Sequence, residues 1–235
     1  MIDIRPFDTL GHADHGWLNA RHHFSFANYH DAGRMGWGRL RVWNDDEIAA
    51  GNGFDPHPHR DMEIITYVRE GAITHRDNLG NEGRTEAGDV QIMSAGTGVT
   101  HSEYNLEPTT TKIFQIWIMP DTRGAKPHWG AKSFPKAIGE AKFEVLAGGR
   151  EGDVEGGALP INADAAVMAT TLSKGQELRL TLKPGRAAYL VAAKGSAQVN
   201  GVALNPRDGA AIEDEGEIVI VANDEAELVL VEVAA

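Results

Sequence analysis

The chain has 235 residues, with 22 Lys and Arg against 34 Asp and Glu, a formal net charge of −12, 42% hydrophobic residues and no cysteine. This hydrophobic content excludes a mainly disordered chain, and the lack of cysteine excludes disulfides, thiolate ligands, iron–sulfur clusters and a cysteine nucleophile. The negative charge opposes binding to a phosphate backbone, so we expect no direct nucleic-acid partner and favour a metal cation or a neutral small molecule as ligand.

The sequence lacks the composition of a membrane or export segment. A bilayer span needs about 20 consecutive apolar residues, and the longest uninterrupted apolar run is Ala187–Ala193. The first residues show no basic cluster followed by an apolar stretch, which is how a secretory signal begins. We therefore expect a soluble, cytoplasmic protein with no membrane partner.

Short apolar segments, many rich in β-branched residues, alternate with glycine-containing turns along the chain. In chain order, the expected strands are Leu40–Trp43, Met62–Arg69, Ala72–His75, Val90–Met93, His101–Asn105, Lys112–Met119, Val167–Leu172, Glu177–Leu182, Ala187–Ala193, Ser196–Val199, Glu217–Val221 and Ala226–Val233. Asp77–Asn81 and Val199–Gly201 are typical hairpin turns. Helical periodicity is weak, so helix is expected only as short turns near residues 121–129 or 135–141. The pattern predicts an all-β protein.

A weak internal repeat suggests two similar units. Tyr67–Gly71 followed by Ala87–Asp89 resembles the later pair Ala188–Gly195 and Asp208–Gly209. Each half would then be an antiparallel barrel of about 100 residues, which closes on itself and exposes few strand edges. Residues 121–136, with two glycines and two prolines, are interpreted as the link. Chance also produces such similarities, so the repeat alone leaves duplication and coincidence both open.

All ten histidines lie at or before His128, so chemistry that needs imidazole is expected in the first half. His57 and His59 stand just before a strand-like run. Side chains two apart on an extended backbone point to the same face, about 6.6–7 Å apart. Two imidazoles so placed can converge on one ion at about 2.0–2.2 Å.

His101 and Glu103 repeat this spacing, with a carboxylate in the second place. If the two strands face one another, three nitrogens and one oxygen surround a single site. Either pair alone is also compatible with histidines on a surface loop. Both pairs follow a glycine-rich turn and begin or lie within an apolar strand, and this shared context favours a metal site.

Two longer motifs carry a resemblance to the cupins. Gly51-x5-His57-x-His59-x3-Glu63-x7-Gly71 resembles the first cupin motif, and Gly88-x5-Ser94-x-Gly96-x4-His101-x3-Asn105 resembles the second. The first is one residue longer than usual before its last glycine. The second has Ser94 in place of proline and two extra residues before His101. These departures are similar to the pirin family, in which the motifs read H-P-H-R-x-x-E and H-x-E.

Other segments also resemble pirins: Gly11–Trp17, His23–Tyr29, Arg41–Asp46 and Gln115–Ile118. The resemblance is dense over residues 10–120 and architectural thereafter. It implies a bicupin, two double-stranded β-helix barrels, with a metal-binding cupin domain at 1–125 and a metal-free cupin-like domain at 126–235. The ligands implied by motif position are His57, His59, His101 and Glu103.

Two further positions follow from the motif comparison. General cupins would use Glu63 as the carboxylate ligand, but with Glu103 in that role Glu63 is interpreted as a supporting or barrel-lining acid. The positions in the second half that correspond to His57 and His59 are Thr181 and Lys183, which agrees with a metal-free second barrel.

Three neutral imidazoles and one carboxylate around a divalent ion leave up to two open octahedral positions, a set related to non-haem Fe(II) oxygenases. One divalent transition metal is expected, with Fe(II) the natural candidate, although Zn, Ni, Co, Mn or Cu would also bind such ligands. The resemblance to bacterial pirins implies that the chain is an iron-dependent quercetin 2,3-dioxygenase, also called a quercetinase, which is an oxidoreductase. Its substrates would be a flavonol-like aromatic compound and O2. Glu103 would then be the catalytic general base for the flavonol 3-hydroxyl.

Two other functions stay open at this point. Pirins also act as regulatory protein-binding partners, in which case the metal would set the shape of a binding face, and other cupins isomerise small polar substrates. Phe54, Met93, Tyr104 and Trp117 are candidates to line the pocket, or else to pack in the core or at its rim. The remaining histidines are interpreted as structural (His12, His15), as flanking a strand (His22, His23) or as surface and hairpin residues (His30, His75, His128).

Overall fold

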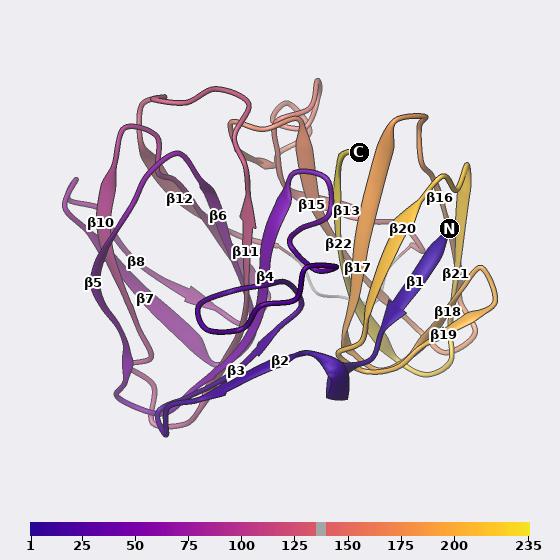
Figure 1. Cartoon of the computed structure of the whole chain (residues 1–235), viewed down its shortest axis with the longest axis horizontal. Helices are drawn as coiled ribbons and strands as arrows, with labels where there is room; N and C mark the ends of the chain where they lie inside the picture. Colours follow the sequence, from indigo (N-terminus) through magenta and orange to yellow (C-terminus); the bar gives the residue numbers. More distant parts are fainter. Residues whose placement is uncertain (135–139) are drawn as a thin grey trace.

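The computed structural model describes residues 1–134 and 140–235, in which the regular secondary structure is all strand apart from one short 3-10 helix, η1 (Phe7–Thr9). Figure 1 shows two barrels side by side, one formed mainly by the N-terminal half of the chain and the other mainly by the salmon-to-yellow C-terminal half. No helix in the described residues has the length and apolar character to cross a bilayer. The expected all-β, two-barrel architecture is confirmed.

The first barrel combines two sheets. Its seven-stranded sheet has the order β12 (His128–Ser133), β9 (Asp89–Ser94), β6 (Glu63–Glu70), β11 (Thr111–Ile118), β4 (Leu40–Ile48), β3 (Leu18–His22) and β2 (Gly11–Asp14). Its four-stranded sheet has the order β5 (Gly53–His59), β10 (Val99–Tyr104), β7 (Ala72–Asp77) and β8 (Glu82–Glu86).

The second barrel repeats this plan. Its seven-stranded sheet has the order β1 (Ile2–Arg5), β20 (Gly209–Glu213), β17 (Arg186–Lys194), β22 (Ala226–Ala234), β15 (Ala165–Leu172), β13 (Glu144–Gly148) and β14 (Leu159–Pro160). Its four-stranded sheet has the order β16 (Glu177–Thr181), β21 (Glu217–Ala222), β18 (Ala197–Val199) and β19 (Val202–Leu204). Strand by strand, the order β5-β10-β7-β8 matches β16-β21-β18-β19, which supports the duplication suggested by the repeat.

Every strand expected from the sequence overlaps an observed strand, and both hairpin turns form. In the β18–β19 turn, Asn200 and Gly201 both have positive φ, 48° and 80°, as a two-residue turn of this kind requires. The helical turn expected near residues 121–129 is wrong, because residues from His128 onward pair with β9 as strand β12. Most of the other expected turn, residues 135–139, lies outside the described residues.

Two strands lie across the predicted division after residue 125. Strand β1, from the start of the chain, pairs with β20 of the second barrel, whereas β12 pairs with β9 of the first. The segment interpreted as a link therefore supplies an edge strand to the first barrel. The domains 1–125 and 126–235 stay a proposal, with these two strands exchanged between the sheets.

The two seven-stranded sheets pack face to face through a shared apolar core. Trp43 of β4 contacts Phe114 at 5.4 Å and Tyr189 of the second barrel at 5.6 Å between ring centroids. The interior of the second barrel is filled by apolar side chains such as Leu178, Ile218 and Ile220. This filling leaves the first barrel as the one with a polar interior.

A buried histidine lies in the contact between the barrels. His23 is 0% exposed, and its Nδ1 lies 2.9 Å from the hydroxyl of Tyr189. Burial, reinforced by the charges of Arg5, Arg34 and Arg207, holds the pKa of His23 well below its ordinary value. The folded protein therefore keeps this imidazole neutral at a pH where the unfolded chain protonates it.

The stability of the protein should consequently fall in acid. The unfolded chain binds a proton at His23 below about pH 6.5 while the folded chain does not, so the free energy of unfolding decreases there by up to about 1.4 kcal/mol per pH unit for this group. His23→Asn keeps an acceptor oxygen near Nδ1 but cannot titrate. Urea unfolding from pH 7 to pH 4.5 should show a shallower decline for the variant, and equal slopes would contradict this role for His23.

Candidate metal centre

Strands β5 and β10 bring the histidines together at one end of the first barrel. The antiparallel register places His101 opposite His57 and Val99 opposite His59, with a shift between His101 and Glu103. His57 and His59 are two residues apart on β5, so their side chains share a face, and alternate residues of β10 are buried in the barrel. Strand β5 was not among the expected strands, although extended backbone was expected at His57 and His59, and it contains two prolines. They are tolerated here because β5 is an edge strand that pairs only with β10.

The three imidazoles converge closely enough to share one ion. His57, His59 and His101 each offer a nitrogen, and these nitrogens all lie within 4.8 Å of one another. The Nε2 atoms of His57 and His101 are 3.1 Å apart. Two nitrogens that each lie about 2.1 Å from an ion, at right angles, are about 3.0 Å apart. The donor set therefore fits a divalent transition metal.

The protonation of these imidazoles also suits a metal. The Nδ1 of His57 lies 2.7 Å from the carbonyl oxygen of Asp55 and can donate to it, which leaves Nε2 with a free lone pair. Burial, with the neighbouring imidazoles, lowers the pKa of His59 to about 4 and that of His101 to about 3. Both rings are neutral at pH 7, and neutral imidazole is the form that binds metals.

Glu103 lies behind the histidines, with both carboxylate oxygens hydrogen-bonded. Gln91 Nε2 donates to Oε1 and Gln115 Nε2 donates to Oε2, each at 2.6 Å, and Thr66 Oγ1 donates to Oε1 at 3.1 Å. The side chain is 1% exposed. Potential ligand atoms of Glu103, His75 and His101 lie within 4.8 Å of one another. Among the described residues, no group of this kind joins Glu103 to His57 and His59.

His75, interpreted from the sequence as a surface or hairpin residue, is in fact 0% exposed. Its Nδ1 lies 3.3 Å from Nδ1 of His101. The local signal was present, because His75 and Asp77 repeat the two-residue spacing on β7. Its significance depends on the pairing of β7 with β10, which places His101 opposite Asp77 and which a single sequence does not reveal.

Glu63 lies on the other face of the sheet, so the interpretation of Glu63 as a barrel-lining acid is wrong. Its neighbours Ile65 and Tyr67 belong to the core between the barrels, and Ser94 Oγ donates to its carboxylate. Burial raises the pKa of Glu63, against the hydrogen bonds from Ser94 and from the backbone of Asn162. Its role is in the contact between the barrels.

A cavity of about 530 Å³ opens over the histidines. His57 and His59 form part of its wall, and the remaining lining is largely aromatic and apolar: Trp17, Leu18, Phe26, Phe54 and Trp117, together with His15, Gly53, Asp55 and Gln115. The expected lining role of Phe54 and Trp117 is thus confirmed. His15, interpreted as structural, also lines the cavity.

Two other expected lining residues lie elsewhere. Met93 packs with Ile64 and Val99 in a small apolar cluster. Tyr104 donates its hydroxyl hydrogen bond to Asp55 and is not in the cavity wall. Both residues sit on strands that were predicted, but which face they occupy depends on register.

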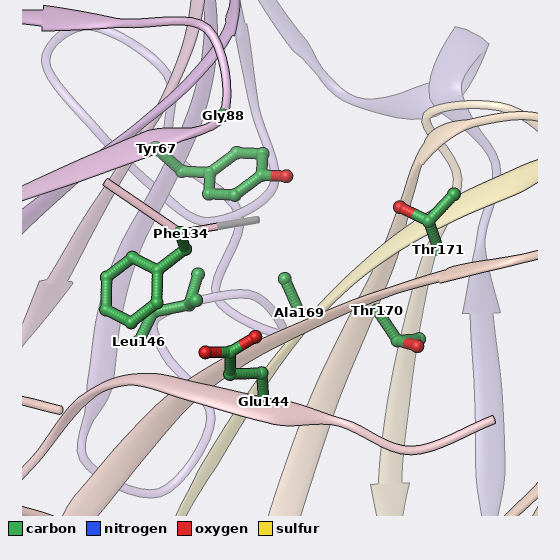
Figure 2. Close-up of a pocket in the computed structure, with 8 residues that line it drawn as sticks. All are labelled: Tyr67, Gly88, Phe134, Glu144, Leu146, Ala169, Thr170 and Thr171. Atoms are coloured by element: carbon green, nitrogen blue, oxygen red, sulfur yellow. The ribbon is translucent and has the colours of Figure 1, made fainter. Parts of the chain in front are cut away.

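Two other cavities are less suited to bind a substrate, because one is very small and the arginines of the other are already paired. Figure 2 shows one between the barrels, with Tyr67 and Phe134 on one side and Ala169 and Thr171 on the other, and its volume of about 30 Å³ has room for about one or two waters. A larger hollow of about 670 Å³ on the second barrel is charged. Its two arginines are already engaged by carboxylates: Arg150 with Asp153 and Glu232, Arg186 with Asp164 and Glu232.

Comparison with known proteins agrees with this picture. The family model described as Pirin matches residues 4–118, and the one described as Quercetinase C-terminal cupin domain matches residues 151–233. A Pseudomonas aeruginosa protein, named provisionally as a quercetin 2,3-dioxygenase, is 66% identical over 234 residues, covering 100% of both chains. The quercetin 2,3-dioxygenase of Escherichia coli K12 is 43% identical, covering 98% of this chain and 97% of its own.

A solved structure links the fold to a metal. The E. coli pirin YhhW in complex with nickel(II) superposes with a TM-score of 0.93 at 40% identity, covering 100% of this chain and 99% of its own. The histidines of β5 and β10 thus lie in a fold that binds a divalent transition metal in a similar protein.

Proposed function

This chain belongs to the pirin family, and on that premise we propose that it is a metal-dependent dioxygenase of the quercetin 2,3-dioxygenase type. The proposed substrates are a flavonol-like aromatic compound and O2, with cleavage of the heterocycle releasing carbon monoxide and a depside. The observation that carries the proposal is the convergence of three imidazoles, two of which, His57 and His59, lie in the wall of an aromatic-lined cavity.

We assign His57, His59, His101 and Glu103 as the ligands and Fe(II) as the ion. Three neutral nitrogens and one carboxylate leave a net charge of +1 and open positions for oxygen ligands, as in related non-haem iron sites. Zn, Ni, Co, Mn and Cu also suit nitrogen-rich ligands, so the metal supply decides the occupant. When bound, the ion supplies a Lewis acid that lowers the pKa of a coordinated hydroxyl and a site for oxygen chemistry.

The side chains of the cavity fit a flat aromatic substrate. Trp117 packs edge-on against His59 at 4.9 Å and against Phe26 at 5.4 Å between ring centroids. Trp17 and Phe54 pack edge-on at 5.4 Å on the same cavity. These rings would hold the flavonol beside the imidazoles and exclude water from the reacting atoms.

Glu103 is the proposed general base. Its carboxylate lies within 4.8 Å of a ring nitrogen of His101, and we propose that it accepts the proton of the flavonol 3-hydroxyl. Gln91 and Gln115 hold the two oxygens in place. Removal of this proton makes the substrate an electron-rich enolate, the form that reacts with O2.

The test is anaerobic reconstitution with Fe(II), followed by addition of quercetin and O2. We expect O2 uptake and carbon monoxide release in equal amounts, and no uptake by the protein after chelation. A protein that binds iron stoichiometrically but consumes no O2 with any of several flavonols would contradict the enzymatic proposal while leaving the metal centre intact.

A further inference from the structure

We infer that His75 and Asp77 form a positioning pair that fixes the orientation and the tautomer of the His101 imidazole. The pair selects which nitrogen of His101 faces the metal. This inference rests on the proposed metal centre but is independent of the substrate and of the dioxygenase reaction.

The ring nitrogens form a continuous chain of contacts. On the side toward β5, Nε2 of His101 lies 3.1 Å from Nε2 of His57. On the other side, Nδ1 of His101 lies 3.3 Å from Nδ1 of His75, and Nε2 of His75 lies 3.2 Å from Oδ2 of Asp77. His101 is therefore contacted at both nitrogens.

One assignment of hydrogens satisfies the whole chain. If Nε2 of His101 binds a metal, it carries no hydrogen, so Nδ1 is the N–H of a neutral ring. That N–H donates to Nδ1 of His75, whose own hydrogen is then on Nε2 and donates to Asp77. The opposite tautomer of His75 would set two N–H groups against each other and leave Asp77 without this donor.

Asp77 is held firmly enough to act as the fixed end. Its Oδ1 accepts the backbone N–H groups of Leu79 and Asn81, each at 2.9 Å, and its Oδ2 accepts Asn81 Nδ2 at 2.8 Å. The side chain is 1% exposed. These hydrogen bonds fix the position of the carboxylate in the β7–β8 hairpin turn.

The ring of His75 is held just as closely. It stacks on Trp129 of β12, with ring centroids 5.1 Å apart and planes within 13°. Gly83 lies opposite His75 in the β7–β8 register, and a Cβ at Gly83 would be 2.2 Å from Trp129 Cη2. The missing side chain at Gly83 therefore makes room for the tryptophan that fixes His75.

These contacts favour a positioning role over a second metal site made of His75, His101 and Glu103. The Nε2 of His75 already lies 3.2 Å from the Asp77 carboxylate. His75 Nδ1 faces His101 Nδ1, so a shared ion would have to displace the contact between them. Partners of this kind typically change metal affinity by about 10–100-fold.

The experiment is a calorimetric titration of the full chain with Ni(II), giving stoichiometry and Kd. His75→Phe keeps the ring stacked on Trp129 but removes both nitrogens, and His75→Asn keeps an acceptor oxygen near Nδ1. We expect one ion per chain throughout, a Kd weakened by about 10–100-fold in His75→Phe, and a Kd near that of the wild type in His75→Asn. His22→Phe, at another buried histidine that contacts Asn44 and not His101, is the matched control with unchanged Kd.

A second measurement observes the ring N–H proton of His101 directly by NMR. In the Co(II)-loaded protein, the N–H of His101 should give a hyperfine-shifted proton resonance that exchanges slowly with water, retained in His75→Asn and lost or fast-exchanging in His75→Phe. If His75→Phe does not fold, His75→Leu takes its place, with the same expectation.

Each other outcome has a distinct meaning. Wild-type affinity in His75→Phe would overturn the positioning role. A second bound ion in the wild type that disappears in His75→Phe would overturn it in favour of a ligand role. Absence of metal binding by the wild type would contradict the proposed metal centre itself.

Discussion

His101→Ala is expected to abolish stoichiometric metal binding, the largest single effect in the molecule. His101 is the only histidine that β10 contributes to the converging group, and the two that remain come from one edge strand. Its loss should weaken the Kd for Ni(II) or Fe(II) by more than the roughly 100-fold that loss of an outer partner costs. Metal analysis after dialysis gives the stoichiometry, and titration gives the Kd.

The matched control is His30→Ala, at an exposed histidine of the first barrel, which should bind metal like the wild type. Thermal unfolding of the metal-free proteins checks that His101→Ala still folds. A folded His101→Ala protein that retains one tightly bound ion would contradict the assignment of His101 as a ligand.

Glu103→Gln is expected to lower kcat by about 10²–10⁴-fold, the usual contribution of a positioned general base. The substitution removes the proton acceptor while keeping nearly the same shape. It also sets an amide NH2 against a donor, because Gln91 and Gln115 both point their NH2 groups at this side chain. Reversing those amides would break their bonds from Thr85 and Trp117.

The measurement is the rate of carbon monoxide release from quercetin, with the metal content of each protein determined in parallel and rates expressed per bound ion. This correction separates the loss of a base from the loss of a ligand. Wild-type turnover per bound ion in Glu103→Gln would contradict the role of Glu103 in proton transfer.

The histidine pair of β5 was predictable because the spacing that carries it is local. Two residues of an extended chain share a face whatever the rest of the fold does, so His57 and His59 could be paired before any topology was known. The glycine turns of both barrels leave a weak repeat in the sequence for a similar reason, but that repeat alone left duplication and coincidence both open. Extended backbone was expected at this pair, but the full extent of strand β5 was not, and its prolines are compatible with a strand only at a sheet edge.

What the sequence did not reveal depends on contacts between distant strands. His75 becomes buried because Trp129, 54 positions later in the sequence, packs on it from a strand that was expected to be a helical turn or a link. The sheet faces on which Glu63 and Met93 lie depend on the strand register, which the sequence does not reveal. The exchange of β1 and β12 between the barrels likewise rests on long-range pairing.

The ligand set is tested most directly by anomalous diffraction from a crystal of the protein reconstituted with Fe(II) without oxygen, recorded on both sides of the iron absorption edge. We predict one anomalous peak in the first barrel, about 2.0–2.2 Å from nitrogens of His57, His59 and His101 and from an oxygen of Glu103. A peak that lacks any of these four contacts, or one on the second barrel, would contradict the account.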